Sequence, residues 1–131
     1  MRQILFKAKR LDNGEWVEGG YVNKTDYYGI ECDEHYIIDG TVTDMEGYGE
    51  HYLVDKDTIC QYTGLPDKNG NKIWENDVLK GGLVVTWEKE FASFCLSRKG
   101  WAFRHFFGEA VNGCDCEAIG NIFDNPELIG E

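Results

Sequence analysis

Two turn signals lie close together between residues 58 and 87, and they constrain the fold of this chain more than any other feature. Asn69-Gly70 stands between two segments of strand character. The pair predicts a type I′ hairpin, because that turn needs positive φ at both central residues. Gly81-Gly82 stands between two further apolar segments and predicts a second hairpin. Two successive hairpins form a meander, and a strongly twisted meander tends to curl into a small barrel.

The chain begins with another strand pattern. Residues 3–9 alternate between apolar and polar side chains, with one exception at Leu5. Residues 12–14, Asp-Asn-Gly, are typical of a turn, and residues 15–22 return with strand character. We therefore predict an N-terminal β-hairpin.

Three strand segments follow the meander, and the chain then forms a short helical turn. The strand segments are residues 91–96, 101–107 and 117–123. Asn125 and Pro126 predict the N-cap and the first residue of one helical turn, because proline lacks the N–H that this position leaves unbonded. The aromatic residues expected in the barrel core are Trp74, Trp87, Trp101 and Phe103.

Residues 23–50 give weak structural signals and are strongly acidic. From Asp26 to Asp57 there are ten acidic residues against one basic residue, so this part carries −9 of the net charge of −11. Residues 27–30 and 35–38 could each form a short strand, whereas the glycines and carboxylates favour exposed loops. We expect an irregular acidic insertion whose tyrosines dock onto the core or onto a partner.

Length and composition favour one folded domain. A chain of 131 residues with 42% hydrophobic and 14% aromatic content is long enough to bury a core. We divide this domain into an N-terminal hairpin with the acidic variable segment (1–57), a β-barrel core (58–125) and a tail (126–131).

The sequence also has the features of a soluble cytoplasmic protein. No run approaches the roughly 18 apolar residues of a membrane-spanning helix, and the N-terminus lacks the apolar core of a signal peptide. The five cysteines are an odd number, which favours free thiols in a reducing compartment. A net charge of −11 disfavours nonspecific binding to nucleic acid or to anionic membranes, which attract basic surfaces.

Two motifs follow one another in an order and spacing that a known family shares. Residues 61–78 contain Q-Y-T-G-L, D-K-N-G and I-W-E-N-D-V, and residues 119–128 read I-G-N-I-F-D-N-P-E-L. Together with the opening strand, these motifs resemble the YopX family of bacterial phage and prophage proteins. Trp74 and Asn76 stand where that family usually has Tyr and Gly, and Asn tolerates a left-handed backbone. The resemblance implies an SH3-like barrel, a bacterial host cell and no established biochemical activity.

The motif Cys114-Asp115-Cys116 is the strongest local candidate for metal or redox chemistry. On a strand its two sulfur atoms would share a face, and Cys95 or His105 could complete a tetrahedral zinc site. A structural zinc site usually has two CxxC-type pairs, and this chain has a single CxC. A strained redox pair is the other functional interpretation, and incidental thiols near a turn are favoured over both. We therefore expect no metal and no cofactor, with Cys114 and Cys116 as weak candidates.

Other catalytic signals are missing from the sequence. It contains no nucleophile elbow, no Walker motif and no dinucleotide-binding glycine pattern. Residues 67–71 begin like a calcium loop, but Lys72 and Val78 stand where that loop needs Gly and Glu. We predict that the protein is not an enzyme and has no catalytic residues.

Two groups of residues are candidates for binding. The basic and aromatic group comprises Arg98, Lys99, Trp101 and Arg104. It combines the charge and the stacking ring that single-stranded nucleic acid requires. The acidic group comprises Glu31, Asp33 and Glu34.

The leading functional hypothesis is a non-catalytic phage or prophage accessory protein. It would bind a host or phage macromolecule, with a protein as the candidate partner, and it would assemble as a homo-oligomer through sheet edges or aromatic patches. The alternative is an acidic mimic of DNA that occupies a host DNA-binding protein. A metal or redox protein and a single-stranded nucleic-acid binder are the less favoured hypotheses.

Overall fold

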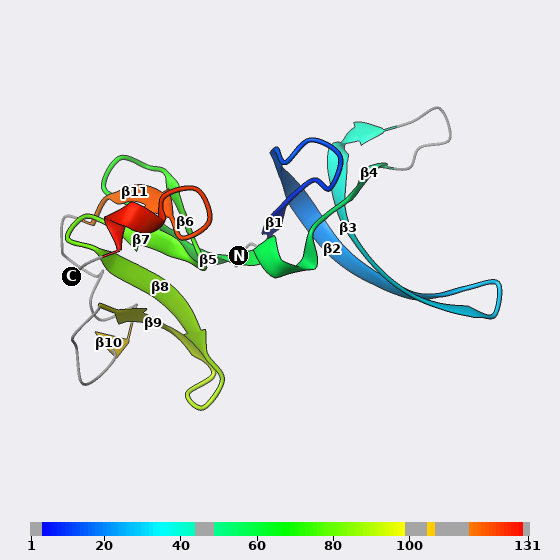
Figure 1. The fold of residues 1–131 in the computed structure, drawn as a ribbon. Helices are drawn as coiled ribbons and strands as arrows, with labels where there is room; N and C mark the ends of the chain where they lie inside the picture. Colours follow the sequence, from blue (N-terminus) through cyan, green and yellow to red (C-terminus); the bar gives the residue numbers. More distant parts are fainter. Residues whose placement is uncertain (1–3, 44–48, 99–104, 107–115, 130–131) are drawn as a thin grey trace. The chain divides into compact units, whose positions relative to one another are not determined.

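The computed structural model describes residues 4–43, 49–98, 105–106 and 116–129, and the fold is mainly β (Figure 1). Contacts divide the chain into two compact units, residues 1–61 and 62–131. None of the helices in the described ranges is long and apolar enough to cross a membrane.

The first unit contains an antiparallel meander in the order β4-β3-β2-β1. Its elements are β1 (Phe6–Lys9), β2 (Trp16–Tyr27), β3 (Ile30–Thr43), β4 (Gly49–Leu53) and the 3-10 helix η1 (Lys56–Thr58). Strands β1 and β2 confirm the predicted N-terminal hairpin, and Gly14 in its turn has φ 74°. The core of this unit centres on Ala8, Ile37 and Val54, with Phe6 and Tyr21 among the side chains packed around them.

Strands β2 and β3 are longer than their neighbours. Strand β1 pairs with β2 only as far as Gly19, and β4 pairs with β3 only from Tyr36 onward. Residues 20–35 therefore extend past both neighbours as a two-stranded antiparallel ribbon, visible as the long blue and cyan arm in Figure 1. We call this segment the ribbon.

The ribbon corrects the expectation of an irregular acidic insertion. Tyr27 pairs with Ile30, so the connection has two residues, Tyr28 and Gly29. Their φ values of 50° and 81° are both positive, as a type I′ turn requires. This turn matches the twist of the flanking strands. Residues 20–38 therefore pair as a hairpin, with one shift of register between Lys24 and Asp26.

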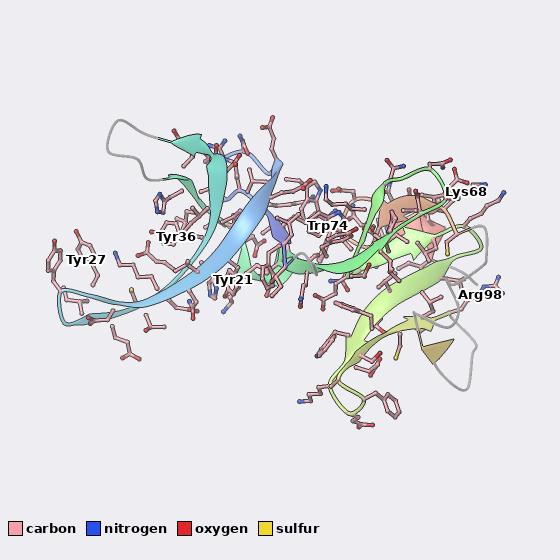
Figure 2. All side chains as sticks on the ribbon, turned by 180° about the vertical axis from the view of Figure 1, so that it is seen from behind. Tyr21, Tyr27, Tyr36, Lys68, Trp74 and Arg98 are labelled. Atoms are coloured by element: carbon pink, nitrogen blue, oxygen red, sulfur yellow. The ribbon has the colours of Figure 1, made fainter. Side chains whose placement is uncertain are left out.

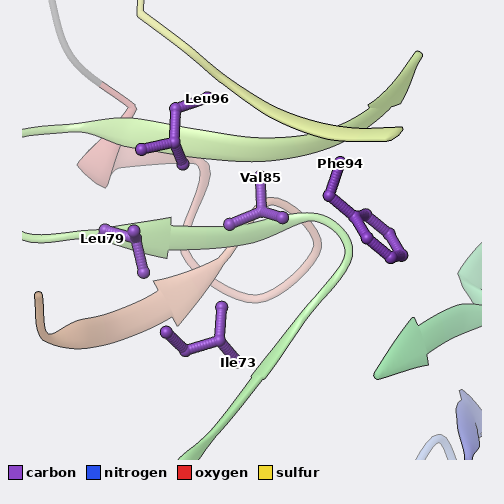
Figure 3. Packing of buried hydrophobic residues seen from close by; sticks show 5 residues of the cluster. All are labelled: Ile73, Leu79, Val85, Phe94 and Leu96. Atoms are coloured by element: carbon purple, nitrogen blue, oxygen red, sulfur yellow. The ribbon is translucent and has the colours of Figure 1, made fainter. Parts of the chain in front are cut away.

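The second unit contains the sheet β10-β9-β8-β7-β11. Its strands are β7 (Asp77–Leu79), β8 (Leu83–Glu88), β9 (Ser93–Ser97), β10 (His105–Phe106) and β11 (Ala118–Asn121). Strand β5 (Cys60–Pro66) begins in the first unit beside β1 and continues in the second beside β6 (Lys72–Trp74). The buried core of this unit, drawn in Figure 3, comprises Ile73, Leu79, Val85, Phe94 and Leu96.

The predicted barrel is not confirmed, because the described strands form open sheets that do not close on themselves. Strands β6 and β7 have three residues each, which leaves little length for the tilt and stagger of a closed barrel. Trp74 is buried as predicted, whereas Trp87 is 44% exposed. Trp87 lies past the part of β8 that pairs with β7. Among the described aromatic rings, its recorded contact is a T-shaped one with Phe94, with the ring centroids 5.1 Å apart. Trp101 and Phe103 lie outside the described residues.

The two predicted turns are present, and one of them has an unexpected geometry. Gly81 and Gly82 both have positive φ and connect β7 to β8. Asn69-Gly70 connects β5 to β6, but only Gly70 has positive φ, so the type I′ prediction is wrong. The Asp67 carboxylate shapes this turn by accepting the backbone N–H groups of Asn69 and Asn71, each at 2.9 Å.

The C-terminal turn is also confirmed, with a different role for its cap. The 3-10 helix η2 spans Pro126–Leu128, and Asn125 occupies the N-cap position. The Asn125 side chain makes no capping hydrogen bond, and its oxygen accepts the backbone N–H of Asn121 at 3.3 Å. The asparagine therefore ties the helical turn back to β11.

Candidate functional site

The tip of the ribbon exposes large apolar side chains. Tyr27, Tyr28 and Ile30 are 51%, 88% and 68% exposed, and Figure 2 shows Tyr27 at the end of the arm. The rings of Tyr27 and Tyr28 meet edge to face with their centroids 4.6 Å apart. Exposed aromatic clusters of this kind are frequent at binding surfaces, because they offer a large contact area with few rotatable bonds.

One face of the ribbon is acidic. Asp26 pairs directly with Glu31 in the strand register, and Asp33 follows two residues later on the same face. All three side chains are exposed, and like charges that lie directly opposite one another destabilise a hairpin. We call Asp26, Glu31 and Asp33 the acidic face.

The opposite face of the ribbon exposes several apolar side chains and also carries the cross-strand partners Lys24 and Glu34. The register and the alternation of a strand place Val22, Tyr27 and Ile30 on it, and all three are exposed. The ammonium group of Lys24 lies 4.3 Å from the centre of the Tyr27 ring, a cation–π contact. We call Val22, Tyr27 and Ile30 the apolar face.

A hydrogen-bonded network lies at the base of the ribbon. The Tyr21 hydroxyl lies 2.6 Å from Nδ1 of His35, and Nε2 of His35 lies 2.9 Å from Asp33 Oδ1. In a neutral imidazole, Nε2–H then donates to Asp33 and Nδ1 accepts from Tyr21. Because both ring nitrogens are engaged, His35 is suited to holding β2 and β3 together.

Hydrogen bonding, burial and nearby charges shift the pKa values of Asp33 and Tyr21 in this network. The hydrogen bond from Asn23 lowers the pKa of Asp33 against the opposing effect of burial, and His35 and Lys56 lower it further. Burial, and after it the negative charge of Asp33, raises the pKa of Tyr21. Asp33 is therefore a carboxylate at neutral pH, and Tyr21 is a neutral hydroxyl that can donate to His35.

A shallow cavity of about 260 Å³ opens beside the network. Leu11 and Leu53 contribute apolar walls, and Asp33, His35 and Lys56 contribute polar groups. The Lys56 ammonium lies 3.7 Å from Asp33 Oδ2, so the cavity has a paired charge at its rim. This pair is exposed on both sides and contributes little to stability.

The structure divides the acidic group that the sequence predicts as a binding site. Glu31 and Asp33 lie together on the acidic face, whereas Glu34 lies on the other face opposite Lys24. The Glu34 carboxylate accepts the Tyr36 hydroxyl at 3.1 Å. The ribbon thus brings together two of the three predicted acids.

The basic and aromatic group falls largely outside the described part of the chain. Arg98 is exposed directly after β9, while Lys99, Trp101 and Arg104 lie outside the described residues. Cys114 lies outside them as well. Cys116 is half-buried against the core of the second unit, and within the described ranges no cluster of His, Cys, Asp and Glu could hold a metal.

Neither the role of Tyr28 in the turn nor the Tyr21–His35 pair was predicted from the sequence. Tyr28-Gly29 is a weaker turn signal than Asn-Gly, because tyrosine rarely adopts positive φ. The Tyr21–His35 contact depends on the β2–β3 register, which a one-residue shift would have changed. The available signal for the pair was the strand character of residues 35–38.

Comparisons with known proteins identify a family and a fold. The model of the family described as YopX protein matches residues 5–130. The crystal structure of protein EF1440 from Enterococcus faecalis is similar, with 22% sequence identity and a TM-score of 0.55, covering 98% of this chain and 99% of that one. At this level of identity the similarity extends to the fold alone. A comparison with curated proteins finds no match.

Proposed function

We propose that this chain, which belongs to the YopX family, acts by binding another protein through the tip of the ribbon rather than by catalysis. It would be an accessory protein of a phage or prophage in the cytoplasm of a bacterial host. The observation that carries the proposal is Tyr28, an aromatic residue that is 88% exposed at a left-handed position.

The backbone of Tyr28 makes this exposure significant. Its φ of 50° lies in the left-handed region, which costs a residue other than glycine about 1–2 kcal/mol. Asn or Gly suits this turn position better. Because the Tyr28 ring is mostly exposed, its burial in the free protein does little to offset the free-energy cost of the left-handed backbone. We therefore expect the ring to become buried when the protein binds a partner.

The experiment compares partner capture by the wild-type protein and by Tyr28→Asn. Both proteins are immobilised and exposed to bacterial lysate after phage induction, and the bound proteins are quantified by mass spectrometry. We expect the variant to lose about tenfold or more of its partner, the effect of removing an aromatic hot spot. Phe91→Ser removes an aromatic side chain that is also exposed but lies outside the ribbon, and it should leave capture unchanged. Equal capture by wild type and Tyr28→Asn would refute the proposal.

The acidic mimic of DNA is a second candidate, favoured by the acidic face. Asp26, Glu31 and Asp33 project from one side of the ribbon, as phosphates project from a strand of DNA. If this function is correct, the protein competes with duplex DNA for a basic repressor or nuclease of the host. Replacing the three acids by Asn or Gln would then abolish the competition, and persistence of the competition would exclude mimicry.

Self-association is the remaining expectation about partners. The exposed aromatic tip and the open strand edges are compatible with a homo-oligomer. Light scattering on the purified protein measures its molar mass directly.

A further inference from the structure

We propose that the ribbon binds an extended partner segment in which basic and apolar residues alternate, and that this segment adds as a new strand to the open edge of β3 at residues 30–34. This inference rests on the protein-binding function proposed above and specifies the chemistry of the partner. It follows from the edge, from the two faces and from the charge of the ribbon.

The backbone edge of β3 is open along residues 30–34. Strand β4 pairs with β3 from Tyr36 onward, and the last backbone contact on this side is the Val54 N–H donated to the His35 carbonyl at 2.9 Å. No other described strand pairs with residues 30–34 on that side. Such an edge carries the N–H and C=O groups that an added strand needs.

The side chains along this edge alternate in chemistry. From Ile30 to Asp33, Glu31 and Asp33 lie on the acidic face, whereas Ile30 and Cys32 lie on the apolar face. The alternation ends at Glu34, which lies on the apolar face opposite Lys24. Side chains of an added strand also alternate between the two faces. A segment that alternates Arg or Lys with Leu, Ile or Val would therefore place each cation beside a carboxylate and each apolar group beside Ile30 and Cys32.

The charges on the acidic face favour a basic partner. Within the described part of the chain, neither Asp26 nor Glu31 forms an ion pair or a side-chain hydrogen bond, although they lie directly opposite one another. A cation from the partner would remove this repulsion. A second copy of the chain would instead bring a further set of carboxylates to the same face, and nucleic acid would bring phosphates.

The Tyr27 ring supports the same partner chemistry. Lys24 already places its ammonium group 4.3 Å from the ring centre, which shows that this ring accepts a cation. An arginine near the tip could contact the same aromatic pair, because Tyr27 and Tyr28 are both more than half exposed. The tip and the edge would then bind one continuous segment.

The test uses a fluorescently labelled peptide that alternates arginine and leucine. Its binding to the full chain is measured by fluorescence anisotropy, and the changed backbone amide signals are assigned by NMR. Two control peptides are used: one has the same composition with the arginines and leucines in separate blocks, and the other has glutamine in place of arginine. We expect the alternating peptide to bind about tenfold or more tightly than either control, with the largest amide shifts at residues 30–34.

Matched variants separate the contributions of charge and apolar contact. Asp26→Asn combined with Glu31→Gln removes two charges and keeps the size of each side chain, and Ile30→Thr keeps a β-branched residue on the strand. Each variant should bind the alternating peptide about tenfold more weakly, and added salt should weaken wild-type binding more than that of the charge variant. Circular dichroism verifies that the variants remain folded.

The outcomes distinguish this inference from the proposed function. If the block peptide binds as tightly as the alternating one, or if the amide shifts lie away from residues 30–34, strand addition is overturned. If the charge variant forms dimers without losing peptide affinity, the acids serve to prevent edge pairing and the inference is wrong. Either result leaves protein capture through Tyr28 intact, whereas unchanged capture by Tyr28→Asn would overturn the proposed function itself.

Discussion

A single carboxylate, Asp67, connects two motifs that are far apart in the sequence. One of its oxygens accepts the N–H groups of Asn69 and Asn71 in the β5–β6 turn, and the other accepts the N–H of Ala118 in β11 at 3.1 Å. The D-K-N-G motif is therefore a folding device that ties the turn to the C-terminal strand. The position of this turn was predicted correctly from Asn69-Gly70, but the role of Asp67 was not predicted. The contact between Asp67 and Ala118 spans 51 residues and therefore leaves no local signal in the sequence.

We predict that Asp67→Asn lowers the melting temperature at neutral pH. We also predict that the melting temperature of this variant falls less than that of the wild type when the pH is lowered. Burial by itself raises the pKa of Asp67, but the three backbone N–H bonds outweigh it and hold the pKa below the ordinary value of 3.8. A carboxyl group whose pKa is lower in the folded state than in the unfolded state stabilises the protein at any pH above the unfolded-state pKa. This stability is lost as the pH falls through the folded-state pKa. Melting curves of wild type and variant from neutral pH to below about pH 4 measure the effect.

Asp57→Asn is the matched control, because it removes an exposed carboxylate from η1. It should leave the acid dependence nearly unchanged. If the melting temperatures of wild type and Asp67→Asn fall by the same amount across this pH range, the role given to Asp67 is contradicted.

At the scale of the element, the ribbon shows what local sequence can and cannot predict. The N-terminal hairpin and the Gly81-Gly82 turn were predictable, because glycine and a polar turn segment mark both connections. The ribbon was not, because its turn uses Tyr28 at positive φ and its acids suggested an exposed loop. Its candidate binding edge depends on where β4 stops pairing, which no local pattern encodes.

We predict that Tyr28→Asn stabilises the ribbon by about 1 kcal/mol, because asparagine tolerates the left-handed backbone that tyrosine adopts there. Native-state hydrogen exchange of the amides in residues 22–35 measures the change. Greater protection together with weaker partner capture would show that the tyrosine is retained for binding. Faster exchange in the variant would mean that the Tyr27–Tyr28 ring contact outweighs the backbone strain.

At the scale of the whole molecule, the described residues form two hydrophobic core clusters with different members. Ile37 is fully buried in the first unit, and Ile73 is fully buried in the second. The sequence predicted one domain around one barrel, because a turn-rich chain of this length carries no linker signal. The closure of a sheet depends on long-range pairing, so the open sheets could not be derived from the turns.

The separate cores lead to a prediction about cooperativity. Ile37→Ala and Ile73→Ala each remove a buried side chain, and each should destabilise its own unit by about 2–5 kcal/mol. Because Ile37 and Ile73 belong to different core clusters of the described residues, we expect hydrogen exchange to accelerate mainly in residues 4–61 for Ile37→Ala and mainly in residues 62–129 for Ile73→Ala. Strand β5 pairs with β1 in the first unit and with β6 in the second. Equal acceleration in both units by either variant would instead establish one cooperative domain, as the sequence predicts.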